Sequence, residues 1–290
     1  MRFTTRSAVV LMLPALLLYG IFLVYPTLHG IELSFTNSQG VAGGQFVGLA
    51  NYRRLLHDST VISALENTVV FAVFVVVVQN AIALGVAYWL NSMPALRNFV
   101  RGGLLLPSTM SAVTIGYVWS VIYSPIGGPL DSVMTALGLH HLEQVWLGNA
   151  HTALLAIAVA NIWAYIGYSA TIYLSNYLAI PQALFDAALV DGATGFRRFR
   201  TIDWRLLAPA LTVNIALTAI GSLKVFELPL VMTNGGPFNA TESLSLVIYQ
   251  DSFGNYQFGY GAAVAVLLLA VTVVVSLLLV KLLRRREVAF

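Results

Sequence analysis

Polar side chains recur at helical spacing inside two long apolar segments of this sequence. They are Asn161, Tyr165 and Tyr168 in one segment, and Asn214, Thr218 and Ser222 in another. Side chains three or four residues apart share one face of a helix, so each set forms a polar stripe. Polar groups in such segments either hydrogen-bond to a neighbouring helix or contact a polar solute. The spacing alone leaves both interpretations open.

A charged pair follows the second stripe. Lys224 and Glu227 are three residues apart, which is a pairing distance on a helix. An unpaired lysine in the middle of a bilayer costs roughly 2.5–3.5 kcal/mol on insertion, so a partner is expected. Lys224 also falls on nearly the opposite helix face from Ser222. These points favour a structural ion pair, and an electrostatic site for an anionic solute is the alternative.

The sequence carries no pattern typical of catalysis. It contains no cysteine, no H-E-x-x-H, no G-x-S-x-G and no Walker A sequence. We therefore expect no catalytic residue, no metal ligands and no nucleotide site in this chain.

The composition indicates that these residues lie in a membrane. Of the 290 residues, 58% are hydrophobic and 9% are charged, whereas soluble domains carry about 25% charged residues. About 20 apolar residues cross the hydrocarbon core as a helix. Six segments reach that length, at approximately 8–31, 66–90, 99–123, 151–175, 206–228 and 261–283. The sequence predicts an all-α, polytopic membrane protein with six transmembrane helices in a single domain, 1–290, with lipid as a partner and no nucleic acid.

The basic residues indicate the orientation of the spans. With the N-terminus in the cytoplasm, twelve of the fifteen Lys and Arg residues fall on the inner side. Only Arg53 and Arg54 fall in outer loops, and Lys224 lies in the fifth span. Inner loops are enriched in Lys and Arg, so we expect both termini to be cytoplasmic.

One inner loop, residues 178–205, has more structure than a simple connection needs. Pro181 suits the first turn of a helix, and Asp191-Gly192 is a turn signal because glycine accepts a positive φ. The apolar side of a second short helix carries Phe196, Phe199 and Ile202. The pattern predicts a helix–turn–helix that another protein can approach closely. An amphipathic helix lying on lipid headgroups is the alternative.

This loop resembles the EAA loop of ABC importer permeases. The family pattern is E-A-A, three residues, G, nine residues, I, one residue, L-P. Asp186-Ala187-Ala188, Gly192 and Ile202 fall at that spacing. Asp186 replaces the usual Glu and keeps its charge, while Trp204-Arg205 stands where Leu-Pro is expected.

Further stretches resemble the carbohydrate branch of these permeases. Val231-Met-Thr-Asn-Gly-Gly-Pro237 lies between spans five and six, and Phe258-Gly-Tyr-Gly-Ala-Ala begins near the last span. Tyr25-Pro26 and Gly48-Leu-Ala-Asn-Tyr52 are similar to the maltose-type first permease subunit. The resemblance covers nearly the whole chain.

The resemblance implies a type I ABC importer in the plasma membrane of a prokaryote. Its other parts would be a second permease subunit, two copies of a cytoplasmic ABC ATPase that binds ATP and Mg, and an extracytoplasmic solute-binding protein. This chain would bind no cofactor and would form half of the path for a di- or oligosaccharide.

The resemblance also implies roles for particular residues. Sugar contacts would come from Asn161, Tyr168, Thr218 and Ser222, with Thr114 as a weaker candidate. Coupling to the ATPase would involve Phe185, Asp186, Ala187, Ala188, Asp191, Gly192, Phe196 and Ile202.

Three alternatives are open at this stage. The solute could instead be glycerol phosphate or an amino sugar. An ion-coupled secondary transporter would ordinarily carry more intramembrane carboxylates and an inverted repeat, and neither is evident. A membrane scaffold would use the loop only as an anchor, and the polar stripes count against it.

Overall fold

The computed structural model describes residues 5–40, 43–139, 141 and 143–285. Arg2 and Arg286, two of the twelve basic residues expected on the inner side, lie outside these residues. The chain divides into two compact units, one formed by residues 1–62 with 247–269 and the other by 63–246 with 270–290. Within the described residues both units are helical, and the β structure is an isolated antiparallel bridge between Thr36 and Phe46. That the whole chain is a single permease domain stays a prediction.

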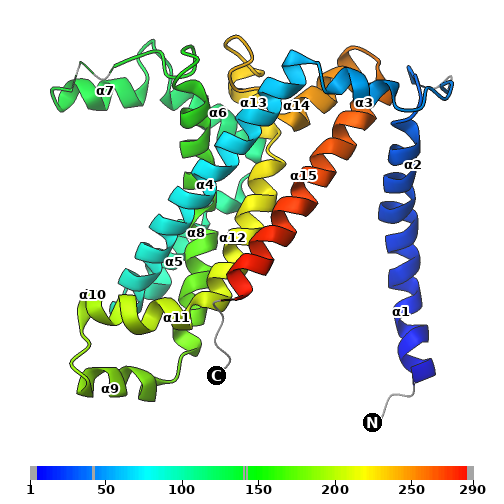
Figure 1. Cartoon of the computed structure of the whole chain (residues 1–290). Coiled ribbons are helices and arrows are strands. Elements are labelled where there is room, and N and C mark those ends of the chain that lie inside the picture. The colour runs from blue at the N-terminus through cyan, green and yellow to red at the C-terminus, as the bar shows by residue number, and fades with distance from the viewer. Residues whose placement is uncertain (1–4, 41–42, 140, 142, 286–290) are drawn as a thin grey trace. The chain divides into compact units, whose positions relative to one another are not determined.

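Four described helical segments are long and apolar enough to cross a membrane without a break. The first, Met12–Leu33, combines the end of α1 (Thr5–Tyr19) with η1 (Gly20–Val24) and α2 (Tyr25–Leu33). The others are α4 (Ser59–Ser92), α8 (Ala153–Ala179) and α15 (Phe258–Arg284) (Figure 1). Between them they account for four of the six expected spans.

The other two expected spans are bent rather than straight. Arg97–Thr109, which contains α5 (Arg97–Leu105) and η2 (Pro107–Thr109), meets α6 (Ala112–Ile122) at 98°. Phe199–Leu206, which contains η4 (Phe199–Asp203) and α11 (Trp204–Leu206), meets α12 (Ala208–Leu223) at 66°. Pro209 stands at the second break, in the first turn of α12, where it cannot continue a preceding helix. Pro107 begins η2, shortly before the first break. Counting each bent pair as one span gives six.

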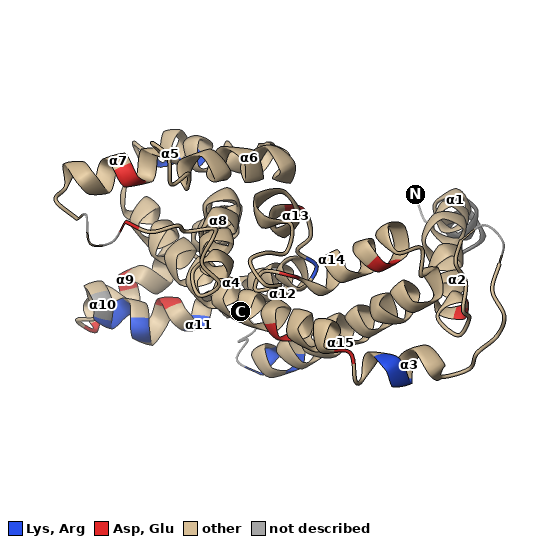
Figure 2. Ribbon diagram, turned by 90° about the horizontal axis from the view of Figure 1, so that it is seen from above, with Lys and Arg blue, Asp and Glu red and all other residues tan. Residues whose placement is uncertain are grey.

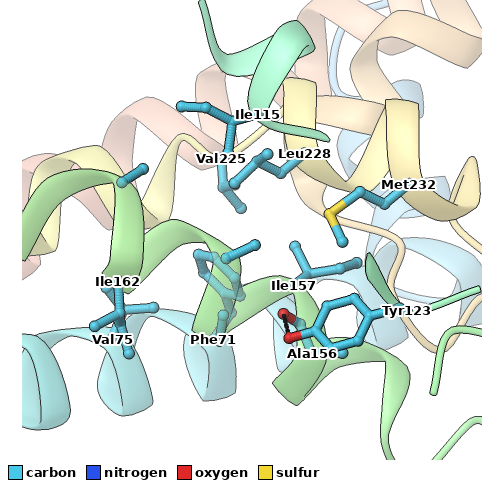
Figure 3. Close-up of a cluster of buried hydrophobic side chains, with 13 residues drawn as sticks. Phe71, Val75, Ile115, Tyr123, Ala156, Ile157, Ile162, Val225, Leu228 and Met232 are labelled. Atoms are coloured by element: carbon cyan, nitrogen blue, oxygen red, sulfur yellow. Dashed lines mark hydrogen bonds between the residues drawn. The ribbon is translucent and has the colours of Figure 1, made fainter. Parts of the chain in front are cut away.

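A buried apolar cluster joins four helices of the second unit. Phe71 and Val75 come from α4, Ile115 from α6, Ile157 from α8, and Leu228 from α13 (Glu227–Thr233) (Figure 3). Tyr123 closes one end, and its hydroxyl donates to the carbonyl oxygen of Ala156 at 3.2 Å. This cluster packs around the part of α8 that carries Asn161.

Helix α8 crosses α5 at very short range. A Cβ on Gly167 would lie 1.9 Å from the carbonyl oxygen of Leu104, a separation no real side chain adopts. Because that neighbour is backbone, it cannot rotate away. The glycine therefore allows the two helices to pack.

We expect Gly167→Ala to destabilise the protein by about 1–3 kcal/mol, because the added methyl group forces α5 and α8 apart. Thermal unfolding of the purified chain in detergent measures the effect. Gly85→Ala is the matched control, since a Cβ on Gly85 of α4 meets nothing within 4 Å. Equal unfolding temperatures for the two variants would contradict the close crossing.

The first unit is held by polar contacts around Tyr260 of α15. Its hydroxyl donates to Asp58 at 2.7 Å, and Arg54 of α3 (Ala50–Leu55) lies over its ring at 3.8 Å. Burial alone would raise the pKa of Asp58, but the hydrogen bonds from Tyr260 and from backbone N–H groups, together with Arg54, hold that pKa below its usual range. Gly259 is also required here, because its Cβ would lie 2.0 Å from the carbonyl oxygen of Thr36. The family-like Phe258-Gly-Tyr-Gly stretch thus has a structural role.

Candidate solute cavity and coupling loop

A cavity of about 230 Å³ opens between α4, α8 and the end of α12 in the second unit. Its lining includes all four residues that the resemblance assigned to the sugar: Asn161, Tyr168, Thr218 and Ser222. Thus α8 supplies one side and α12 the other, because residues at helical spacing share a face. Both polar stripes therefore line the same cavity.

The deep parts of the stripes bond to neighbouring helices. Asn214 is 1% exposed, and its amide donates to Asn80 Oδ1 of α4 at 2.8 Å. Tyr173 donates to the same oxygen. Gln79 donates in turn to the hydroxyl of Ser169 at 2.8 Å. The helix-contact interpretation therefore holds for Asn214, and solute contact by the other stripe residues stays a prediction.

The lining side chains nearer the opening differ in how they are bonded. Tyr168 is 51% exposed, and its aromatic ring offers a flat apolar face beside a hydroxyl group. Thr218 donates to the carbonyl oxygen of Asn214 in its own helix at 2.8 Å, which leaves its oxygen lone pairs as acceptors. This mixture of hydroxyl, amide and aromatic surface suits a solute rich in hydroxyl groups.

Sequence reasoning missed Gln79 and Asn80. Both interrupt the apolar run of α4, so the rule that marked α8 and α12 applies to them as well. Gln79 is 3% exposed, lines the cavity, and leaves its Oε1 atom without a hydrogen bond. A buried acceptor of this kind is costly unless a solute or water donates to it.

The predicted ion pair between Lys224 and Glu227 does not form in this structure. Both residues belong to the described part of the chain, and no Lys224 nitrogen lies within 4.0 Å of a Glu227 oxygen. The reason is local: α12 ends at Leu223 and α13 begins at Glu227, so the spacing of a continuous helix does not apply. Both side chains are exposed and line the cavity, so the expectation that Lys224 faces away from Ser222 is also wrong.

Thr114 does not line this cavity. It lies in the first turn of α6, where its backbone N–H donates to Ser111 Oγ at 3.2 Å and its hydroxyl lies 2.8 Å from the same atom. Its place is explained by the cap of a helix that restarts after the 98° bend.

The loop after α8 forms the expected pair of helices. Helix α9 covers Gln182–Val190, and α10 (Gly195–Arg198) continues into η4 and α11. These helices lie at the opposite end of the second unit from α7 (Pro129–Ala136) and α13 (Figure 1). Lys and Arg residues mark α10 and α11 (Figure 2).

The turn between the two helices depends on Gly192. It follows Asp191, the C-cap of α9, and takes a φ of +67°, the left-handed conformation that favours glycine. Its N–H donates to the carbonyl oxygen of Leu189 at 3.0 Å, and the N–H of Ala193 donates to that of Ala188 at 2.9 Å. The predicted turn is present.

Helix α9 presents a different face from the one expected. Ala188 is 1% exposed, and Phe185 is half-buried beneath Arg198, whose guanidinium carbon lies 5.1 Å from its ring centre. The exposed large apolar side chains of α9 are instead Leu184, Leu189 and Val190, at 38%, 64% and 88%. Phe185 and Ala188 therefore hold the loop together rather than forming its outer surface.

The remaining predicted coupling residues are distributed along the loop. Asp186 and Ala187 are exposed on α9, and Asp186 accepts a hydrogen bond from Gln182 at 3.2 Å. Ile202 is half-buried in η4. Phe196 lies in α10, but its side chain is outside the described part of the structure.

Comparison with known proteins shows which family this chain matches. Residues 79–288 match the family described as the binding-protein-dependent transport system inner membrane component. A probable starch degradation products transport system permease protein, AmyD of Thermoanaerobacterium thermosulfurigenes, is 31% identical over 95% of this chain and 93% of its own. The trehalose/maltose transport system permease protein MalF of Thermococcus litoralis is 31% identical over 89% and 86%.

The fold matches a solved structure. A bacterial alginate ABC transporter, crystallised in complex with an alginate pentasaccharide-bound periplasmic protein, aligns with a TM-score of 0.82. The alignment covers 95% of this chain and 93% of the other, at 22% identity. The chain therefore has the type I fold of ABC importer permeases.

The chain belongs to the family of binding-protein-dependent transport system inner membrane components. It is thus an ABC transporter permease, a membrane subunit of a transport system, and its loop 178–205 is the EAA loop of that family.

Proposed function

We propose that this chain is the permease subunit of an ATP-driven importer for a neutral di- or oligosaccharide, and that it forms half of the translocation path. The observation that carries the proposal is the meeting of Asn161, Tyr168, Thr218 and Ser222 in one cavity. Amide and hydroxyl groups there match the hydroxyls of a sugar, and Tyr168 matches its apolar ring face. The names of the relatives, which refer to starch degradation products and to trehalose and maltose, support the same class of solute.

Gln79 extends this site. Its free Oε1 atom would accept a hydrogen bond from a sugar hydroxyl, which would satisfy the buried amide only while solute or water is present.

A second class of solute is supported by Lys224. The lysine is exposed in the cavity and lacks the expected pairing with Glu227. Glu227 lines the same cavity and offsets this charge overall, but an ammonium group without a direct ion pair is still able to bind an anionic group, such as that of glycerol phosphate or an acidic sugar.

The assembly around the chain follows from its family. We propose a second permease subunit, two copies of a cytoplasmic ATPase that bind ATP and Mg, and an extracytoplasmic solute-binding protein. The ATPase would dock on the exposed face of α9, with Asp186 and Ala187 beside Leu189 and Val190. Both termini would be cytoplasmic, in the plasma membrane of a prokaryote.

Uptake into proteoliposomes tests the solute class. The complete transporter, assembled with its co-encoded partners, would be supplied with ATP on the side of the liposome that carries its ATPase. Maltotriose, glucosamine or glycerol 3-phosphate would be offered on the opposite side. We expect ATP-dependent uptake of the neutral oligosaccharide. Uptake of glycerol 3-phosphate alone, abolished by Lys224→Met, would overturn the neutral-sugar proposal in favour of the anionic class.

A further inference from the structure

An acidic side chain lies fully buried at the base of the EAA loop. Asp203 is the last residue of η4 and is 0% exposed. Burial of a carboxylate is costly unless the group is paired and hydrogen-bonded. Asp203 does not line the solute cavity, so its partners show what the burial achieves.

The partners of Asp203 come from both ends of the loop. Arg198 of α10 forms an ion pair with it, and Arg198 Nε lies 3.4 Å from Asp203 Oδ1. The Tyr177 hydroxyl, near the end of α8, is a hydrogen-bond partner of the same carboxylate. Arg198 also covers Phe185 of α9, with its guanidinium carbon 5.1 Å from the ring centre. One carboxylate thus connects the end of α8 with α10 and, through Arg198, with α9.

The backbone around α9 does not itself make a rigid connection. Ile180 and Pro181 are extended, with ψ angles of 127° and 132°, so the helical path of α8 is interrupted before α9 begins. Beyond α9, Gly192 and Gly195 take positive φ angles of +67° and +50°. Non-helical joints of this kind absorb changes in φ and ψ when neighbouring elements move. Side-chain contacts must therefore fix the angle between α8 and α9.

The same region contains the departure from the family pattern, Trp204-Arg205 in place of Leu-Pro. Asp203 and Trp204 both have helical backbone angles, so η4 continues directly into α11. Trp204 packs on Phe199, with ring centres 6.3 Å apart. The 66° bend comes only after Leu206. The continuous segment thus connects the position of Asp203 with the start of α12.

We propose that Asp203 is a positioning residue that clamps the EAA loop to α8, so that α9, α10 and η4 move with that helix as one rigid body. This inference rests on the proposed function, in which the ATPase acts on α9. A buried and paired carboxylate suits this role because such pairs fix geometry more than they add stability. Movement of α9 then reaches α8, which lines the solute cavity, without loss at the extended joint.

The distance between α9 and α4 in the full-length chain tests the clamp directly. The sequence contains no cysteine, so Val190→Cys and Ser92→Cys take spin labels without background. Both positions are exposed, one on α9 and the other at the end of α4. In nanodiscs, electron–electron double resonance should give a narrow distance distribution. Asp203→Asn should broaden it, because the charge that holds Arg198 is removed.

Coupling in the assembled transporter provides the second readout. We expect Asp203→Asn to lower the stimulation of ATP hydrolysis by maltotriose about tenfold, which is within the usual range of coupling between two sites. Co-purification of the ATPase should be unchanged, whereas a misfolded loop would lower it. Tyr177→Phe removes only a hydroxyl group and should show the same two changes more weakly, so it decides the matter if Asp203→Asn does not fold.

Arg200→Gln is the matched control for Arg198→Gln, because both remove one positive charge from the same stretch and Arg200 is exposed. Only Arg198→Gln should broaden the distribution and lower the stimulation. A narrow distribution in Asp203→Asn, or equal effects of the two arginine variants, would overturn the clamp. Broadening with full stimulation would overturn its role in coupling. A wild-type complex that no solute stimulates would instead overturn the proposed function, and the distance measurement would still decide the clamp.

Discussion

Gly192→Val and Ala188→Asp will each abolish the stimulation of ATP hydrolysis by solute in the assembled transporter, while the permease still inserts. The left-handed conformation costs an L-residue roughly 1–2 kcal/mol, and a β-branched side chain makes it worse. A Cβ on Gly192 meets nothing within 4 Å, so this effect comes from the backbone alone. Ala188 is 1% exposed, so an aspartate there would be an uncompensated buried charge, worth about 3 kcal/mol or more.

This prediction rests on the loop as a mechanical link. Alternating access requires that closure of the ATPase pair bias two arrangements of the membrane helices. Helices α9 and α10 lie in the loop that joins α8 to α12, and both of these helices line the cavity. A deformed loop would therefore no longer transmit that bias.

Stimulated ATPase activity and co-purification of the ATPase measure the outcome. Gly192→Asn is the control, because asparagine tolerates the left-handed conformation, and it should keep most of the stimulation. Full stimulation with both Gly192→Val and Ala188→Asp would instead support the alternative that the loop lies on lipid headgroups.

Simultaneous replacement of Asn161, Tyr168, Thr218 and Ser222 by alanine will reduce solute uptake at least tenfold. Each lost hydrogen bond to a neutral solute is worth about 1 kcal/mol, and Tyr168 adds an apolar face, so the combined loss exceeds a factor of ten. Assembly with the ATPase should be unchanged, because the loop helices remain as they are. Radiolabelled uptake and co-purification measure the two quantities.

Two comparisons make this second prediction specific. Thr114→Ala removes a hydroxyl group outside the cavity and should leave uptake unchanged. Lys224→Met removes the charge at the cavity. If Lys224→Met abolishes uptake and the fourfold alanine variant does not, the neutral-sugar site is wrong.

Much of the fold could be predicted because membrane insertion acts on simple patterns. A run of about 20 apolar residues has one stable conformation in lipid, so the six segments were evident without any tertiary information. Gly192 was also predictable, since a turn signal between two amphipathic stretches depends only on local sequence. That Asn161 and Thr218 line one cavity was predicted only from the family resemblance. Helical spacing shows which residues share a face of a helix, but not which helix packs against that face.

The features that the sequence did not predict depend on where helices end and on which residues pack against them. The expected pairing of Lys224 with Glu227 assumed one continuous helix, and α12 ends just before Lys224. Ala188 was expected on the outer face of α9, but small residues also mark close packing, and it is buried. Asn80 was not predicted, because the sequence of α4 alone does not show that it faces Asn214, whose buried amide donates to it.

The most direct test of the account is ATP-dependent solute uptake with and without the partner subunits. The purified chain alone, in liposomes with sugar and ATP, should hydrolyse no ATP and move no solute, because it carries no nucleotide motif and forms half of the path. Adding the second permease, the ATPase and the binding protein should restore both activities together. Uptake by this chain alone, above all uptake driven by an ion gradient, would contradict its assignment as one subunit of an ATP-driven importer.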